Sequence, residues 1–350
     1  MKTCFYRLRF HSPVHFGSSV MGLENTRERV SSDSLCSALI NSFSVLGDAD
    51  EAVNALKQET PGFILSSLFP FGPSELGAGS VYALPCPLTA PCVSDGKIIA
   101  DYGKDLKQIK YLIPSDFFSW IGETPLDSEE VVAVIERSKT LAIPWDSKKE
   151  KGWWAEELRP GVAADRTCQT SSIWRAGTLR FHKDAGLYGL IRINDETWET
   201  GLANAFTLLG ELGIGGERTY GMGCFDFSGF LPLDELGLNM PKSECVRFVL
   251  LSNYFPCADE RSELNNIFEA WDFTENRGYV VSGRMATTLK RKRIRMIAEG
   301  SVTKKSVRGD VADVTPDNGD TLLSHNVYRS GLAFLMPFDN MQSTEDNGGS

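Results

Sequence analysis

A glycine-rich turn lies between two apolar segments, within residues 209–225. Five of the eleven residues at its centre are glycine: Gly213, Gly215, Gly216, Gly221 and Gly223. Glycine weakens helices and strands, but it permits positive φ angles and close backbone approach, so that successive amides can face an anion. Arg218 adds a guanidinium that pairs with phosphate, and Tyr220 adds a ring that can stack on a base or a ribose. The turn is a candidate phosphate-binding loop, and a purely structural turn is the alternative.

The elements around this turn argue against mononucleotide binding. Residues 198–212 have helical periodicity and residues 224–227 resemble a strand, so the turn follows a helix and precedes a strand. In P-loops and dinucleotide-binding turns the order is strand and then helix, and no Gly-Lys-Ser/Thr sequence occurs in this turn.

A basic segment lies in the last third of the chain, although the net charge of the whole chain is −10. Residues 284–308 include nine Lys or Arg residues and one acid, Glu299. The candidates for phosphate contact are Arg291, Arg293, Arg295, Lys304 and Lys305. Strand alternation would place the three arginines on one face, where they could follow a polyanion. A basic stripe on an acidic body localises the field that attracts nucleic acid, and a solvated strand or loop is the alternative.

The elements that position these residues predict an α+β fold. In the first half we expect a strand, a capped helix, further strands, a second helix and a last strand, at residues 3–10, 31–43, 131–143, 178–193, 198–212 and 224–227. The polar residues 31–34 offer helix caps. Residues 60–130 are rich in Pro and Gly and predict an irregular insertion, and residues 160–177 predict a projecting hairpin or loop. This order suggests a ferredoxin-like sandwich.

The second half predicts a degenerate version of the same plan. Pro232, Gly237 and Pro241 indicate a linker before it. Strands are expected at residues 246–251, 279–281, 291–297 and 332–335. The predicted organisation is an N-terminal domain (1–230) with a thumb at about 145–185, a linker (231–243), a C-terminal domain (244–338) and a disordered tail (339–350).

The composition excludes several classes of protein. With 42% hydrophobic and 23% charged residues the chain is typical of globular proteins, and it has no apolar run of about 18 residues that could span a membrane. Arg7 and Arg9 interrupt the apolar N-terminus, which argues against a secretory signal, so a cytoplasmic location is expected. The eight cysteines form no CxxC pair and no zinc spacing, so we expect no metal and no cofactor.

Four segments resemble a known family. The glycine-rich turn is similar to that of the RAMP proteins of CRISPR systems. Three further segments resemble the fourth Csm subunit of type III-A complexes, a relative of the Cas5 group: residues 15–17 with 32–39, residues 164–179, and residues 299–302 with 309–316 and 325–334. The resemblance runs from end to end.

The resemblance implies two ferredoxin-like (RRM-like) domains with a thumb and a glycine-rich loop. It also implies a subunit that binds the repeat-derived 5′ tag of the crRNA, beside the large Cas10-type subunit and the first backbone subunit, and that meets target RNA only indirectly. The residues expected to contact RNA on this basis include His15, Ser32, Asp33, Arg166 and Ser301, besides the turn and the basic segment. Trp174 and Arg175 are the expected thumb residues. We further expect the turn and the basic segment to line opposite sides of one groove.

Two catalytic alternatives remain beside this binding function. Some relatives cleave the guide precursor with a histidine near the first strand, and His11 and His15 are placed for such metal-independent cleavage, which needs a titratable group near the 2′-OH. Backbone subunits cut target RNA with an aspartate, and Asp33 invites that comparison, although helix capping is the better account of it. We expect a binding subunit and not an enzyme.

Overall fold

The computed structural model describes residues 1–17, 22–74, 79–146, 151–164, 171–238, 247–276, 278–280, 289–317, 323 and 325–338. It has a mixed α+β fold. No helix in this part of the chain is both long and apolar enough to span a membrane.

The first half is built on an antiparallel sheet with the strand order β10-β1-β9-β3-β4, in which β2 also pairs with β9 and β11 with β1. The strands are β1 (Lys2–Phe10), β2 (Phe63–Leu65), β3 (Phe69–Pro73), β4 (Ser80–Tyr82), β9 (Gly186–Ile193), β10 (Phe225–Phe227) and β11 (Leu231–Pro232). The long pair β1 and β9 is central, with Cys4 opposite Ile191 and Tyr6 opposite Gly189. The strands expected at the two ends of this half are confirmed.

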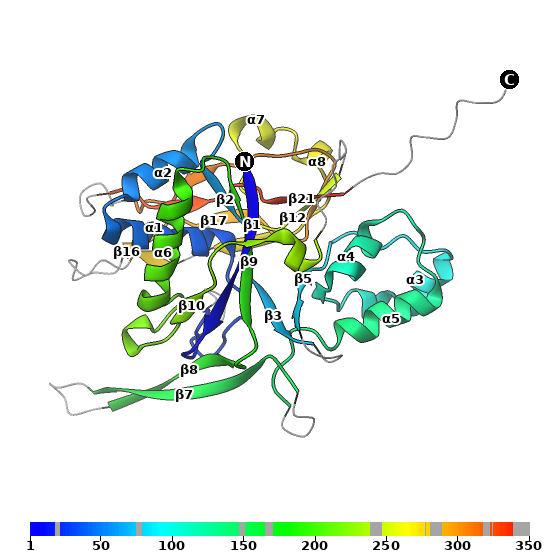
Figure 1. Ribbon diagram of the computed structural model, residues 1–350, viewed down its shortest axis with the longest axis horizontal. Helices are drawn as coiled ribbons and strands as arrows, with labels where there is room; N and C mark the ends of the chain where they lie inside the picture. The colour runs from blue at the N-terminus through cyan, green and yellow to red at the C-terminus, as the bar shows by residue number, and fades with distance from the viewer. Residues whose placement is uncertain are drawn as a thin grey trace.

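Two long helices contact each other and pack on this sheet (Figure 1). They are α1 (Ser32–Leu46) and α6 (Trp198–Leu212), and α2 (Ala49–Lys57) follows α1. Apolar residues at helical spacing, such as Leu35, Leu39 and Phe43 in α1, form the buried stripe. In α6 the ring of Phe206 lies 4.5 Å from that of Tyr6 on the central strand. The expectation of a helix at residues 198–212 is confirmed.

The insertion after β4 carries a helical lobe on the opposite side of the molecule from α1 and α6 (Figure 1). Its elements are β5 (Leu84–Pro85), α3 (Gly96–Leu106), β6 (Tyr111–Leu112), α4 (Pro114–Ile121) and α5 (Ser128–Ser138). The strand expected at residues 131–143 is therefore wrong, because α5 occupies its first part. Asp127 and Glu130 close a capping box at the start of α5, and Val131, Val134 and Ile135 are buried at helical spacing.

A long hairpin leads back to the sheet. Its strands β7 (Trp154–Ala164) and β8 (Ser171–Phe181) pair from Trp154 and Phe181 at the base to Ala164 and Ser171. The hairpin extends away from the body in Figure 1. Residues 165–170, which include Arg166, lie outside the described residues.

The second half has a smaller antiparallel sheet with the order β13-β18-β12-β21. Its strands are β12 (Arg247–Leu250), β13 (Phe268–Ala270), β18 (Val302–Thr303) and β21 (Leu335–Phe338), and the short helices α7 (Ala258–Arg261) and α8 (Leu264–Ile267) connect β12 to β13. Three two-stranded pairs complete this half: β14 (Phe273–Asn276) with β17 (Ile294–Ile297), β15 (Tyr279–Val280) with β16 (Leu289–Lys290), and β19 (Val311–Asp313) with β20 (Tyr328–Ser330).

The two halves share one hydrophobic core. The cluster that contains Leu190 and Ile191 of β9 also contains Val249, Phe334 and Met336 of the second half. Residues 231–238, expected to begin a linker, are instead part of the fold, because β11 pairs with β1 and Leu236 and Leu238 are buried in the same cluster. Residues 239–246 and the expected tail at 339–350 lie outside the described residues.

Candidate functional site

The glycine-rich turn forms one wall of a cavity of about 670 Å³. The other walls are the segments at residues 15–17 and 23–31, the first turns of α1, and residues of β14, β15 and β16 with Arg291. The cavity therefore opens where the first half meets the second. Residues 213–218 of the turn and Arg291 of the basic segment line it together, although they are distant in the sequence.

The lining is strongly basic. Its cationic side chains are Arg27, Arg29, Arg218, Lys290, Arg291 and Arg329, and its acids are Glu217 and Glu275. Ser31, Ser34, Ser37 and Asn41 add neutral hydrogen-bonding groups. Basic side chains that converge in a concave site concentrate the field there, which favours a polyanionic ligand.

The amides of the glycine-rich turn are mostly used inside the protein. The amides of Gly213, Gly216, Gly221 and Gly223 donate, in that order, to the carbonyls of Leu209, His15, Arg218 and Pro13, at 2.8–2.9 Å. The expectation that successive amides face an anion is wrong for these four, because each donor already has an acceptor.

The glycines instead allow close contact between two backbone segments, residues 213–214 and 222–223. Gly223 has φ +82, and a Cβ there would lie 2.1 Å from the carbonyl oxygen of Ile214. Gly213 has φ +76, and its Cβ would lie 2.4 Å from the carbonyl oxygen of Met222. A side chain at either position is excluded by both conformation and space. This close pairing holds the short 3₁₀ turn η1 (Arg218–Tyr220) at the tip, where all three residues are exposed.

His15 lies in the cavity wall, and the residue is 4% exposed. Its Nδ1 is 2.7 Å from the carbonyl oxygen of Gly177 in β8. Because a carbonyl can only accept, Nδ1 carries the proton. The glycines at 17 and 216 pack against the ring. His11, in contrast, is exposed and is not part of the cavity lining. Its Nδ1 lies 3.9 Å from Oδ1 of Asp226.

Arg291 is a half-buried cation at the edge of the cavity. Burial lowers the pKa of its guanidinium to about 10, with a smaller contribution from Arg329. The guanidinium packs over Gly278, where a Cβ would lie 2.2 Å from Nη2. Among the described residues no carboxylate lies within ion-pair distance of it. An anion that binds beside Arg291 would favour the charged form of its guanidinium and offset the cost of its burial.

The remaining residues of the basic segment lie elsewhere. Residues 291–293 precede β17, so the expected strand over 291–297 begins only at Ile294. Arg293 and Arg295 are exposed, beside Glu275 at 3.3 and 3.9 Å, and neither lines the cavity. Lys305 pairs with Glu263, and Lys304 is exposed outside the cavity. Of the expected groove, the structure brings together the turn and Arg291 only.

Three residues expected to contact RNA are buried structural residues, which corrects that expectation for Ser32, Asp33 and Ser301. Asp33 is 0% exposed, and its carboxylate lies 2.8 Å from Nη1 of Arg329 and 3.1 Å from Nδ2 of Asn253. Ser32 accepts from the amide of Asn253, and Ser301 donates to the carbonyl of Ala298. These side chains are committed to contacts inside the protein.

The start of α1 is also capped differently from the expectation. Ser31 occupies the N-cap position without a side-chain capping bond, and the amide of Ser32 donates to Oγ of Ser67, 2.8 Å away. Neither Asp33 nor its serine neighbours therefore supply the cap, because a side chain from another segment accepts the helix amide.

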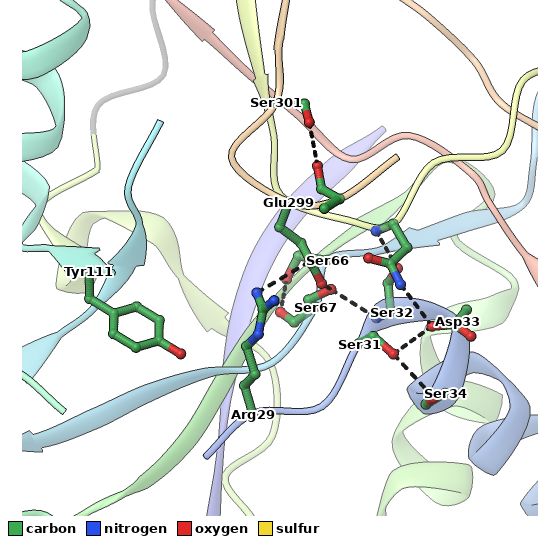
Figure 2. A network of polar contacts seen from close by, with 12 residues as sticks. Arg29, Ser31, Ser32, Asp33, Ser34, Ser66, Ser67, Tyr111, Glu299 and Ser301 are labelled. Atoms are coloured by element: carbon green, nitrogen blue, oxygen red, sulfur yellow. Dashed lines mark hydrogen bonds and ion pairs between the residues drawn. The ribbon is translucent and has the colours of Figure 1, made fainter. Parts of the chain in front are cut away.

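Sequence reasoning missed a second ion pair at the cavity, in which the arginine is partly exposed and the carboxylate is buried. Arg29 Nη1 lies 3.2 Å from the buried carboxylate of Glu299, which raises the pKa of Arg29. Ser67 donates to the same carboxylate. Figure 2 shows these side chains converging beside the residues at the start of α1. Nothing in the local sequence signals Arg27, Arg29 or Arg329 as wall residues, because their positions depend on long-range packing.

An aromatic pair joins the glycine-rich turn to the hairpin. The rings of Tyr220 and Trp174 are 6.5 Å apart at an interplanar angle of 57°. Tyr220 is 71% exposed, and Trp174 lies over Gly161, where a Cβ would meet its ring at 2.3 Å. Arg175 is exposed on the same strand of the hairpin. The pair offers flat surfaces close to the turn for stacking.

Comparisons with known proteins point to one family. Residues 244–338 match the family model of the CRISPR Csm4 C-terminal domain. The chain is 28% identical to the CRISPR system Cms protein Csm4 of Thermococcus onnurineus over 306 residues, which is 83% of this chain and 88% of that protein. It is 24% identical to the protein of the same description from Methanocaldococcus jannaschii over the full length of both chains.

Solved structures have a similar fold. One is a chain of the Csm3–Csm4 subcomplex in the type III-A CRISPR-Cas interference complex, with a TM-score of 0.58, 19% identity and coverage of 97% of this chain and 100% of that chain. Another is a chain of the Csm1–Csm4 cassette in complex with pppApA, with a TM-score of 0.55, 20% identity and coverage of 98% and 100%. The mixed α+β fold is therefore shared from end to end.

Proposed function

Because this chain belongs to the Csm4 family of type III-A CRISPR subunits, we propose that it binds the repeat-derived 5′ tag of the crRNA in the basic cavity beside its glycine-rich turn. One observation carries the proposal. The cavity gathers six basic side chains and two acidic ones on a chain whose net charge is −10. Such a concentration of positive charge in one concave site suits a sugar–phosphate chain.

The topology supports a RAMP architecture for both halves. In the first sheet the order β10-β1-β9-β3, with α1 and α6 as the connecting helices, corresponds to the strand order 4-1-3-2 of a ferredoxin-like βαββαβ unit. The second sheet, β13-β18-β12-β21, has the same order when read from its other edge. Two short helices, α7 and α8, form its first connection, and among the described residues the β19–β20 pair takes the place of the second helix. We infer two ferredoxin-like domains, with the hairpin β7–β8 as the thumb.

The partners follow from the family. Solved relatives are described as a Csm1–Csm4 cassette and as a Csm3–Csm4 subcomplex. We propose that this chain likewise docks the large subunit, Csm1, and the backbone subunit, Csm3, and that target RNA reaches it only through the guide.

We propose further that the subunit is not catalytic. The cavity lining contains one imidazole, His15, and its Nδ1 is committed to a backbone carbonyl. The alternative is metal-independent cleavage of the crRNA precursor by His11 or His15. Incubation of the full chain with labelled repeat RNA in the presence of a chelator distinguishes the two. Cleavage that is lost in His15→Ala or in His11→Ala would establish the alternative.

The test of tag binding compares two pairs of arginines. In full-length chain titrated with a tag-bearing RNA, Arg218→Ala with Arg291→Ala should weaken binding and make the salt dependence shallower, by about 0.7 per lost phosphate contact. Arg9→Ala with Arg261→Ala is the matched control, because both arginines are exposed and lie outside the cavity. Equal effects of the two double variants, or no effect of the first, would refute the cavity as the binding site.

A further inference from the structure

The imidazole of His15 presents one defined edge to the cavity. Nδ1 is used by the carbonyl of Gly177, so in the neutral ring Nε2 carries the lone pair and can only accept a hydrogen bond. The histidine is thereby fixed in a single tautomer by the hairpin, before any ligand binds.

Two glycines pack against this edge of the ring, where a side chain would cover it. A Cβ at Gly17 would lie 3.0 Å from Nε2, and a Cβ at Gly216 would lie 2.7 Å from Cδ2 of the same ring. A methyl group at residue 17 would therefore cover the accepting nitrogen. The two glycines that pack against this edge line the basic cavity together with His15 and the arginines.

An acceptor in this position selects among the groups of a nucleic-acid backbone. Phosphate oxygens and the ring oxygen of the sugar only accept, so they cannot bond to Nε2 of the neutral imidazole. Apart from a terminal hydroxyl, which RNA and DNA share, the ribose 2′-hydroxyl is the backbone group that can donate, and deoxyribose lacks it. The arginines of the cavity attract either kind of strand, because they contact phosphates.

We propose that His15 is the residue that discriminates ribose from deoxyribose in this cavity, by accepting a hydrogen bond from a 2′-hydroxyl at Nε2. The inference rests on the proposed function, since it assumes that a sugar–phosphate strand occupies the cavity. It assigns to His15 a positive role in specificity that requires no cleavage.

The test uses full-length chain and three labelled oligonucleotides of the same tag sequence: RNA, 2′-fluoro RNA and the 2′-deoxy strand with uracil bases. The 2′-fluoro strand retains the sugar pucker of RNA but cannot donate at the 2′ position. One neutral hydrogen bond predicts roughly two- to tenfold tighter binding of RNA than of 2′-fluoro RNA. Fluorescence anisotropy measures the three affinities.

Gly17→Ala is the decisive variant, because it covers Nε2 without changing His15. It should lower the affinity for RNA to that for 2′-fluoro RNA, while the affinity for 2′-fluoro RNA stays within about twofold. Gly22→Ala is the matched control in the same loop, since a Cβ at Gly22 has no atom within 4 Å. This control should retain the full preference for RNA.

Equal affinity of the native chain for RNA and 2′-fluoro RNA would overturn the inference, as would a preference that persists in Gly17→Ala. The comparison of ligands on the native chain holds even if Gly17→Ala does not fold. A Gly17→Ala variant that keeps the thermal unfolding midpoint of the native chain but loses both strands equally would assign the ring to phosphate, as an imidazolium donor, and would also overturn it. Absence of binding by any strand would refute the proposed function itself, which is a distinguishable result.

Discussion

The carboxylate of Asp33 and the guanidinium of Arg329 lie 2.8 Å apart, although 296 positions separate them in the chain. The first belongs to α1 and the second to β20, so the ion pair joins the two halves directly behind the cavity. Both side chains are almost fully buried. A pair of this kind is costly to break because either partner alone is a buried uncompensated charge.

Asp33→Ala should therefore destabilise the protein strongly. The expected loss in the free energy of unfolding is about 3–5 kcal/mol, because Arg329 is left buried without its counter-ion. Chemical denaturation measures it. Glu199→Ala, which breaks the exposed pair of Lys2 and Glu199, is the control and should cost about 0–1 kcal/mol. Equal losses in the two variants would show that the buried pair has no special structural role.

Two glycines of the same turn should differ in how much an alanine substitution destabilises the protein. Gly223 and Gly221 both have positive φ, but a Cβ at Gly223 would meet the backbone of Ile214 and a Cβ at Gly221 would meet nothing within 4 Å. Gly221→Ala should cost about 1–2 kcal/mol from conformation alone. Gly223→Ala should cost clearly more, because the backbone must also move. Thermal unfolding of the two variants tests this, and equal midpoints would contradict the close-approach account.

Removal of Arg291 should stabilise the free protein and weaken RNA binding. Its pKa is lowered in the folded state, so the charged form opposes folding below about pH 10, and that cost fades as the pH rises from there toward the ordinary arginine pKa. At neutral pH, Arg291→Met should raise stability by about 0.5–2 kcal/mol. RNA affinity should fall at the same time, since a cation is lost from the cavity.

The control for this trade-off is Arg293→Met. Arg293 is exposed beside Glu275, outside the cavity, so neither stability nor RNA affinity should change appreciably. Urea denaturation and anisotropy on the same preparations give both quantities. A destabilised Arg291→Met protein would refute the interpretation of Arg291 as an uncompensated cation.

Tyr220 should contribute by stacking. Tyr220→Ala is expected to weaken RNA binding by about 1–3 kcal/mol if one base stacks on the ring, whereas Tyr220→Phe should retain most of the affinity. RNA should also quench the fluorescence of Trp174, whose ring lies 6.5 Å from that of Tyr220. Comparison with Trp174→Phe isolates that signal from the other tryptophans. Unchanged affinity in Tyr220→Ala would exclude the aromatic pair from the RNA path.

Glu260 should make stability depend on acidic pH. Burial opposes its ionisation, but hydrogen bonds from Cys257, from the backbone of Arg308 and from Tyr254 outweigh that effect and lower its pKa. Because the pKa of Glu260 is lower in the folded state, the ionised carboxylate stabilises the fold at pH values above its unfolded-state pKa, near 4.5. This contribution is lost as the pH falls through the folded-state pKa. Glu260→Gln should flatten the stability profile below about pH 4.5. A profile identical to that of the native protein would contradict this prediction.

The sequence predicts those helices and strands whose buried faces follow from the spacing of their own apolar residues. The apolar spacing in α1 and α6 and the alternation in β1 identify those elements, because the buried faces follow from periodicity alone. The same reasoning failed at α5, where the apolar residues were taken as a strand. The helical spacing of Val131, Val134 and Ile135 and the capping residues Asp127 and Glu130 were both visible in the sequence.

The site was less predictable because its walls meet only through tertiary packing. The glycine-rich turn and Arg291 were identified in the sequence, but Arg29 and Arg329 become wall residues only when Glu299 and Asp33 bind them from behind. Likewise the side chain of Asp33 suggested a surface role, since no local signal reveals a partner 296 positions away.

The hydrophobic cluster shared by the two halves has a consequence for the energetics of association. Because Val249 and Phe334 pack in the same cluster as Ile191, neither half can move relative to the other without exposing apolar surface. The cavity between them is therefore preorganised. Binding of a strand then carries little entropic cost for ordering the protein around it. Most of the entropic cost of complex formation then comes from ordering the RNA. A more flexible unbound tag should therefore bind with lower affinity.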